Sequence, residues 1–163
     1  MHPRSVSRRG ALKAMGALAA LAAVPRPARG QTAGAAPAGI RWNAAAFNAQ
    51  TLEEGLQALG AGAPASTTEV SWGATPEIAE NGAVVPISVT SKIPGTEAIA
   101  ILIERNPNKV AAIFHIPEGT APALSTRVKL SESSLVHALV RTKDGRYFLA
   151  TREIKVTLGG CGG

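Results

Sequence analysis

The chain holds one cysteine, Cys161, and two glycines flank it on each side. Glycine has no Cβ and adopts positive φ angles as readily as negative ones, so such a segment has little preference for one conformation. Five extended residues reach on the order of 17 Å, which lets a thiol enter a narrow pocket of another protein. We therefore predict a flexible arm over residues 159–163 with Cys161 as its reactive residue. The glycines of this arm are Gly159, Gly160, Gly162 and Gly163.

The chemistry expected of Cys161 depends on what surrounds its sulfur. The thiolate is the nucleophile, and helix N-termini or neighbouring cations favour it. Neither is adjacent to Cys161 in the sequence, so we expect a client protein to supply the activation. A single cysteine cannot form an internal disulfide. In an exported protein it indicates a reactive thiol or an intermolecular bond.

Residues 1–30 have the features of an export signal. The pair Arg8-Arg9 is followed by Lys13 and by an apolar run over residues 14–24. That run is too short for a permanent transmembrane helix. Twin-arginine signals direct export in bacteria, and small residues before Gln31 suit a signal peptidase. The segment predicts a periplasmic protein without a membrane anchor.

The signal also accounts for the basic balance of the chain. Six of the 17 lysines and arginines lie in residues 1–30, and none of the 11 acidic residues does. The remaining chain therefore has equal numbers of basic and acidic residues. This removes the electrostatic argument for a nucleic-acid or anionic-membrane partner.

Residues 31–67 are predicted to form a lead-in, a helix and a linker. The composition is helical over residues 43–60, and Thr51 with Glu54 fits a capping box. The apolar face of this helix is formed by Leu52, Leu56 and Leu59. Trp42 and Phe47 are expected to extend the contact of this helix with the core.

Residues 68–158 have the pattern of a β-sandwich. Apolar residues alternate with polar ones, and turn signals separate short segments, which is typical of antiparallel strands. No long helical segment lies between them, which disfavours parallel βαβ units. Pro86 indicates an edge or a bulge, because proline cannot donate to a ladder. The predicted strands are residues 70–74, 84–91, 98–104, 110–116, 124–130, 134–142 and 147–158.

We therefore predict an all-β fold, an immunoglobulin-like antiparallel β-sandwich with an N-terminal helix and a flexible C-terminal Gly-Gly-Cys-Gly-Gly arm. The last strand is expected to be fixed in the core, so that the arm begins where the sheet ends. A hairpin turn is predicted over residues 143–146.

No other residue pattern in the chain indicates catalysis or a cofactor. His115 and His137 lack a partner at metal-ligand spacing, and a copper site combining them with Cys161 is the disfavoured alternative. Motifs for haem attachment, phosphate loops and nucleophile elbows are missing. We predict no catalytic residue, no metal and no cofactor. The glutamates Glu77, Glu80, Glu104 and Glu118 indicate no acid–base pair, and the arginines Arg105, Arg127 and Arg141 are expected in solvent.

Three segments resemble SoxY, the family of sulfur-compound carriers in thiosulfate oxidation. Residues 76–86 resemble the family's entry into the sandwich, and the Asn106-Pro107-Asn108 turn resembles a family turn, although Lys109 replaces a frequent second proline. Residues 156–163, Val-Thr-Leu-Gly-Gly-Cys-Gly-Gly, match the family's carrier-arm motif throughout. Together with the twin-arginine signal, this combination is highly specific.

The resemblance implies a periplasmic carrier without catalytic activity of its own. It implies covalent attachment of sulfur intermediates at Cys161, with the four flanking glycines as a swinging arm. It also implies a heterodimer with SoxZ, a second small β-sandwich protein. Transient partners would be a c-type cytochrome, a dimanganese hydrolase and, where present, a molybdenum-containing sulfur dehydrogenase.

Two other readings of the arm stay open. A terminal Gly-Gly thiocarboxylate, as in ubiquitin-like sulfur carriers, needs ATP-dependent adenylylation, and the strand pattern is not a β-grasp. A structural periplasmic sandwich that dimerises through a Cys161 disulfide is harder to exclude. It predicts that the disulfide dimer is the functional form.

Overall fold

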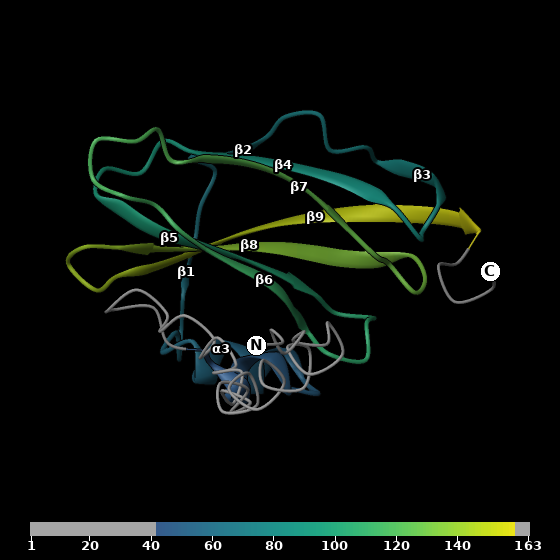
Figure 1. The fold of residues 1–163 in the computed structure, drawn as a ribbon, viewed down its shortest axis with the longest axis horizontal. Helices are drawn as coiled ribbons and strands as arrows, with labels where there is room; N and C mark the ends of the chain where they lie inside the picture. The colour runs from purple at the N-terminus through teal and green to yellow at the C-terminus, as the bar shows by residue number, and fades with distance from the viewer. Residues whose placement is uncertain (1–41, 159–163) are drawn as a thin grey trace, which may run out of the picture. The chain divides into compact units, whose positions relative to one another are not determined.

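Two short helices and nine strands make up the part of the chain that the structure, a computed structural model, describes: residues 42–158 (Figure 1). The signal peptide, the start of the lead-in and the arm with Cys161 therefore lie outside the described residues. Among the described residues, no helix is long and apolar enough to cross a membrane. The elements are α2 (Ala44–Phe47), α3 (Leu52–Ala58), β1 (Ala65–Ser66), β2 (Val70–Trp72), β3 (Ile78–Asn81), β4 (Val85–Ser91), β5 (Thr96–Ile103), β6 (Val110–His115), β7 (Ala123–Val128), β8 (Ser134–Thr142) and β9 (Tyr147–Leu158).

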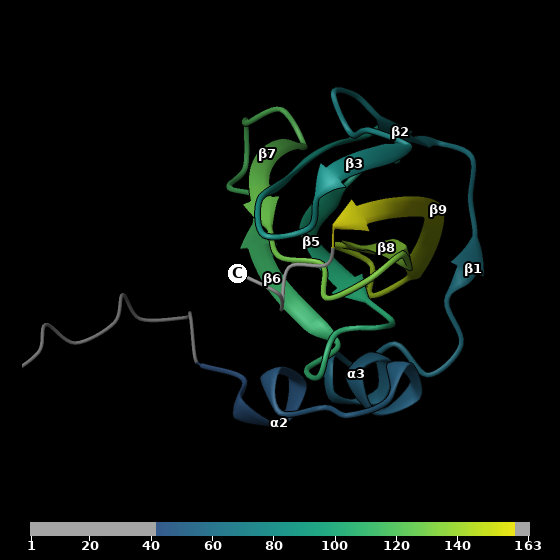
Figure 2. The same cartoon turned by 90° about the vertical axis from the view of Figure 1, so that its right-hand side faces the viewer.

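The strands form two sheets that pack face to face (Figure 2). The larger sheet has the order β1-β9-β8-β5-β6, with β3 also paired to β9. The smaller sheet has the order β2-β4-β7. Pairing is antiparallel throughout, except that β1 and β3 each run parallel to β9. The predicted antiparallel β-sandwich is confirmed, and the two parallel pairings were not predicted.

The core lies between the sheets and is built by alternation along the strands. In β4 every second residue is buried, which leaves Pro86 and Thr90 exposed. Each fully buried isoleucine contributes about 1.5–3 kcal/mol relative to an exposed one. The largest fully buried isoleucines of this core are Ile87, Ile99, Ile101, Ile103 and Ile154.

The outer face of the larger sheet is covered by α2 and α3 rather than by one helix over residues 43–60. The capping box explains the break: Thr51 Oγ1 accepts the backbone N–H of Glu54, and the Glu54 carboxylate accepts that of Thr51. This box starts a new helix at Leu52. Gly60 follows the end of this helix with a φ of 82°. The leucine face packs on Leu102, Val110 and Leu139.

Trp42 is not part of the core, in contrast to the prediction. Its side chain is 74% exposed and stacks on Phe47 with ring centroids 4.3 Å apart. Phe47 packs against the buried cluster beneath α2 and α3, as predicted. Only the inner ring of this aromatic pair therefore contributes to the helix–sheet contact.

All seven predicted strands occur. β4 is the middle strand of the smaller sheet, but Pro86 lies beyond the end of β2 and therefore has an unpaired edge on that side, as predicted. Ser88 donates its backbone N–H to Thr75 Oγ1 on the β2 side. Because alternate residues of a strand point their N–H groups to the same side, the Pro86 nitrogen also faces that side. β2 pairs only with residues 89–91 of β4, so no ladder donor is lost at Pro86.

The predicted turn over residues 143–146 joins β8 to β9. Gly145 has a φ of 79°, and its N–H donates to the Thr142 carbonyl at 2.9 Å. The Thr142 hydroxyl and, secondarily, the Arg146 guanidinium hydrogen-bond to Asp144 and lower the pKa of its carboxyl. Because the pKa of Asp144 is lowered in the folded state, its carboxylate stabilises the fold at pH values above the ordinary pKa of aspartate. This contribution is lost as the pH falls through the lowered pKa.

The position of Gly55 gives a test of the helix–sheet contact. A Cβ at Gly55 would lie 3.3 Å from Val110 Cγ2 and 3.4 Å from Leu102 Cδ2, so a longer side chain has no space. We expect Gly55→Leu to lower the free energy of unfolding by about 1–3 kcal/mol, measured by urea denaturation. Gly62→Leu is the control, because nothing lies within 4 Å of its Cβ position. Equal stability of the two variants would contradict this packing.

Candidate functional site

The end of β9 is the described structure nearest to the predicted arm. β9 is the longest strand, with 12 residues, and its pairing with β8 stops at Ile154, opposite Ser134. The last four residues, 155–158, extend beyond β8. An extension without neighbours would fray, because its backbone N–H and C=O groups would pair only with water.

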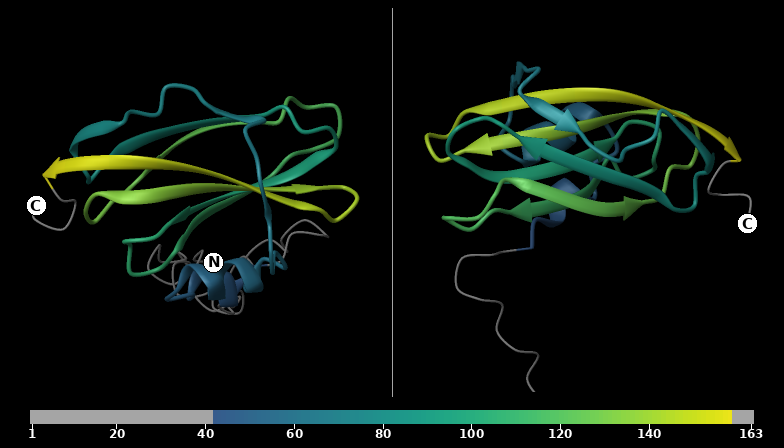
Figure 3. Two further views of the ribbon diagram at one scale, coloured as in Figure 1. Left: turned by 180° about the vertical axis from the view of Figure 1, so that it is seen from behind. Right: turned by 90° about the horizontal axis from the view of Figure 1, so that it is seen from above.

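β3 pairs with this extension on the edge of β9 that faces away from β8 (Figure 3). The parallel register places Ile78 beside Lys155, Ala79 beside Val156 and Asn81 beside Leu158. The Thr157 hydroxyl adds a bond of 2.8 Å to the Glu80 carbonyl. β3 itself is held because Ala79 is buried in the core. The parallel pairing therefore extends the sheet up to the residue before Gly159.

Ser133 replaces the missing β8 partner on the other side of the extension. Its hydroxyl accepts the Val156 N–H at 2.9 Å and donates to the Val156 carbonyl at 3.4 Å. Val156 also packs partly against the core. β9 is thus bonded on both sides until Val156, and Leu158 at its end is 69% exposed.

Gly82 connects the end of β9 to the smaller sheet. Its N–H donates to the Leu158 carbonyl at 2.8 Å, and its carbonyl accepts the Leu130 N–H at 2.8 Å. The Asn81 side chain accepts the Ala83 N–H at 2.8 Å and so fixes the turn after β3. Leu158, the last described residue, is therefore linked through Gly82 to the segment that follows β7.

A cleft of ≈ 500 Å³ lies beside the extension, along the edge of β9 between its pairings with β1 and β3. Arg152 crosses it: Nη1 donates to the Trp72 carbonyl at 3.4 Å and Nη2 to Glu77 Oε1 at 3.3 Å. The cleft combines an aromatic wall with charges of both signs. Its lining is Trp72, Glu77, Ile78, Thr151, Arg152, Glu153 and Lys155.

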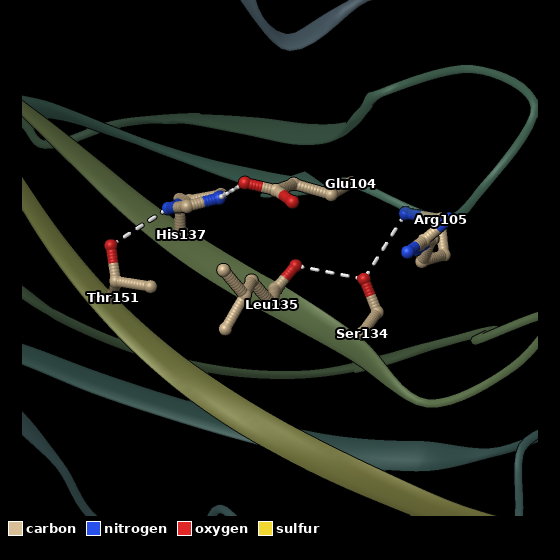
Figure 4. Close-up of polar contacts among 6 residues, drawn as sticks. All are labelled: Glu104, Arg105, Ser134, Leu135, His137 and Thr151. Atoms are coloured by element: carbon tan, nitrogen blue, oxygen red, sulfur yellow. Dashed lines mark hydrogen bonds and ion pairs between the residues drawn. The ribbon is translucent and has the colours of Figure 1, made fainter.

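His137 is buried in a polar network on the outer face of the larger sheet (Figure 4). Its Nε2 lies 2.9 Å from Glu104 Oε1, and its Nδ1 lies 2.8 Å from Thr151 Oγ1. A neutral ring that donates from Nε2 accepts the Thr151 hydroxyl at Nδ1, so both nitrogens have partners. The network explains how a histidine is tolerated there. His137 lies within β8, as the sequence predicted.

The pairing of Glu104 with His137 was missed, because the glutamates were read as isolated. The register of β5 on β8, with Leu102 opposite His137, brings Glu104 to the ring. No local sequence signal encodes that register. Within residues 42–158, no group of three or more histidines, cysteines or acidic residues could hold a metal ion.

The other charged candidates form ion pairs or lie in solvent. Arg141, which was predicted to lie in solvent, is half-buried and pairs with Glu97 at 2.6 Å. Lys143 and Glu118 are exposed and pair at 2.6 Å. The Lys143 ammonium, through its hydrogen bond and charge, lowers the pKa of the Glu118 carboxyl. Arg105 and Arg127 are exposed, as predicted. The described residues bring no acid–base pair together at the end of β9.

The profile of one protein family matches residues 56–161, a range that includes Cys161. The family is described as sulfur oxidation protein SoxY. The chain belongs to the SoxY family. The resemblance inferred from the arm and the two body segments is thereby confirmed over residues 56–161.

A solved SoxY structure agrees with the family assignment. SoxY, the sulfur carrier protein from Chlorobium limicola f. thiosulfatophilum, is 32% identical, with a TM-score of 0.59 over 68% of this chain and 96% of that chain. A superoxide reductase (neelaredoxin) from Ignicoccus hospitalis is 17% identical, with a TM-score of 0.46 over 53% of this chain and 78% of that chain. No curated protein sequence matches the chain.

The SoxY match supports the role of a carrier in sulfur oxidation and a sandwich of the SoxY type. The predicted attachment residue, Cys161, and the arm glycines fall outside the described residues. The structure describes the body that ends immediately before them.

The buried histidine network predicts unequal effects of two glutamate substitutions. Glu104→Ala leaves Nε2 of the buried His137 without its partner, so we expect a loss of about 1–3 kcal/mol in the free energy of unfolding. Glu104→Gln should retain most of the stability that Glu104→Ala loses, because the amide oxygen still accepts from Nε2. Glu118→Ala is the control, since exposed ion pairs contribute at most about 1 kcal/mol. Equal losses for Glu104→Ala and Glu118→Ala in urea denaturation would contradict the network.

Proposed function

We propose that this SoxY-family protein carries the sulfur intermediates of thiosulfate oxidation covalently on Cys161. The supporting observation is that the family match spans residues 56–161, so the cysteine belongs to the matched region. The glycine pairs on both sides of Cys161 form a swinging arm. The body anchors that arm through the pairing of Leu158 with β3.

The division between a fixed body and a mobile arm suits a substrate that several enzymes act on in turn. Cys161 is the third residue after Leu158, which gives a reach of about 10 Å when the chain is extended. Glycines add no side-chain bulk, so the arm can pass through a narrow opening. The arm thus brings one sulfur atom to successive buried active sites.

The chain needs no catalytic group of its own for this role. Oxidative coupling forms one new S–S bond between the outer sulfur of thiosulfate and the sulfur of Cys161. The adduct is Cys–S–S–SO₃⁻, and the two electrons released pass to the c-type cytochrome. The dimanganese hydrolase then adds water, which releases sulfate and two protons and leaves a persulfide on Cys161. A molybdenum-containing sulfur dehydrogenase oxidises that sulfur where it is present.

The setting of this cycle is the periplasm, and the structural partner is SoxZ. The support for export is the twin-arginine pair Arg8-Arg9 and the apolar run over residues 14–24. SoxZ, a second β-sandwich, is the usual partner of the family that the chain belongs to. We propose that the functional unit is a heterodimer of the two.

The decisive experiment is intact-protein mass spectrometry of the exported protein from cells grown on thiosulfate, with and without reductant. We expect reducible additions with the masses of sulfur, sulfite or thiosulfate, mapped to Cys161. The Cys161→Ser variant should carry none and should abolish thiosulfate-dependent oxygen uptake. A clean thiol, or only a homodimer disulfide, would instead support a structural sandwich.

Glycine substitutions in the arm test the swinging motion separately from attachment. Gly160→Val and Gly162→Val restrict the backbone and add bulk next to the thiol. We expect at least about a tenfold loss of turnover in a reconstituted thiosulfate-oxidation assay, with unchanged thermal unfolding. Gly62→Val, in an open loop of the body, is the control. Normal turnover by the arm variants would contradict a swinging arm.

A further inference from the structure

β6 has a free outer edge. It is the last strand of the larger sheet, and within residues 42–158 only β5 pairs with it. Ile116 donates its N–H to Glu97 on the β5 side. In an antiparallel ladder the alternate residues face the other way, so Ile113 and His115 direct their N–H and C=O groups outward.

Beyond a bulge at its start, this edge lacks the devices that usually protect edge strands. Proteins shorten such strands or place charges and proline on them. β1 and β2 have only two and three residues, β3 contains Glu80, and β7 contains Arg127. The six residues of β6, Val-Ala-Ala-Ile-Phe-His, include no lysine, arginine, acidic residue or proline. A register shift at its start places an extra residue, Ala111, in a bulge and leaves residues 112–115 as a regular edge.

A groove of ≈ 510 Å³ lies between the end of β7 and the start of β6 with the turn before it. Its lining is Asn106, Pro107, Asn108, Val110, Ala111, Ala112, Thr126, Arg127, Val128 and Lys129. The charged side chains that line it are Arg127 and Lys129, and no acidic side chain lines it. Neither cation forms an ion pair within the described residues.

We infer that β6 accepts an extended segment of the partner subunit, which adds to the larger sheet as a further strand. The segment is acidic: its backbone pairs with Ile113 and His115, and its carboxylates lie toward Arg127 and Lys129. Strand addition takes its affinity from main-chain hydrogen bonds and its specificity from alternate side chains. The inference rests on the proposed heterodimer and names the surface that forms it.

Amide hydrogen exchange measured by NMR tests the pairing directly. The full chain is compared alone and with SoxZ of the same organism. In the free protein the amides of Ile113 and His115 should exchange rapidly, because they have no partner. In the complex both should slow by on the order of 100-fold. A SoxZ complex in which these two amides stay fast would overturn the inference.

Matched variants test which edge and which charges the partner uses. His115→Pro removes only an outward N–H from an exposed residue, and should weaken SoxZ binding by at least about tenfold. Ser125→Pro makes the equivalent change on the free edge of β7. Lys129→Glu should weaken binding by about tenfold at low salt and less at high salt, whereas Lys92→Glu, at the other end of the smaller sheet, should not. Thermal unfolding verifies that each variant is folded.

The outcomes distinguish a wrong binding surface from a wrong binding partner. Loss of binding with Ser125→Pro but not with His115→Pro would place the segment on β7 and overturn the inference. Protection of Ile113 and His115 in the free protein at high concentration would identify a second copy as the occupant and overturn it too. If SoxZ does not bind the unmodified chain at all, the proposed heterodimer fails together with this surface. The mass of the Cys161 adduct reports on the carrier role independently.

Discussion

The parallel pairing of β3 with the last four residues of β9 determines where the rigid body ends. β8 stops opposite Ile154, and the strand would end there as an ordered element without β3 and Ser133. At about 3.3 Å per residue, the anchor of the arm would then lie about 13 Å earlier. If the proposed arm began there, it would be longer, search a larger volume and present its thiol less often at a given opening. The long, doubly supported β9 therefore sets the length of the proposed arm.

The larger sheet keeps the end of β9 apart from the free edge of β6. β6 lies three strands from β9 in the order β9-β8-β5-β6. At about 4.8 Å per strand, β9 and β6 lie roughly 14 Å apart. A strand added at β6, as we propose, would therefore leave the end of β9 uncovered, and the proposed arm would stay accessible to other proteins.

Much of the body was predictable because its local signals agree with its tertiary structure. The alternation in β4, the glycine turns and the capping box at Thr51 are each encoded within a few residues. The capping box at Thr51 was predicted, but the helical composition over residues 43–60 did not show that a separate short helix, α2, precedes it. Trp42 was misplaced because an aromatic side chain can stack on a neighbour, as it does on Phe47, instead of entering the core.

Features that depend on register between distant segments were not predictable. β1 and β3 are too short to show a period, and their parallel pairing with β9 joins segments far apart in the sequence. The contact of Glu104 with His137 arises in the same way, from the pairing of β5 with β8. The candidate attachment residue, in contrast, was evident from composition alone, because its surroundings are local and consist of glycine.

The dependence of β1 and β3 on β9 also affects how the molecule folds. Both short strands precede most of the sandwich in the sequence, yet they pair only with the last described strand. Non-local pairing of this kind slows folding, because long loops must close before the contact forms. During synthesis β1 and β3 stay unpaired until β9 has emerged, and the body cannot complete its larger sheet before then. The strand that carries the arm is therefore also the strand that closes the fold.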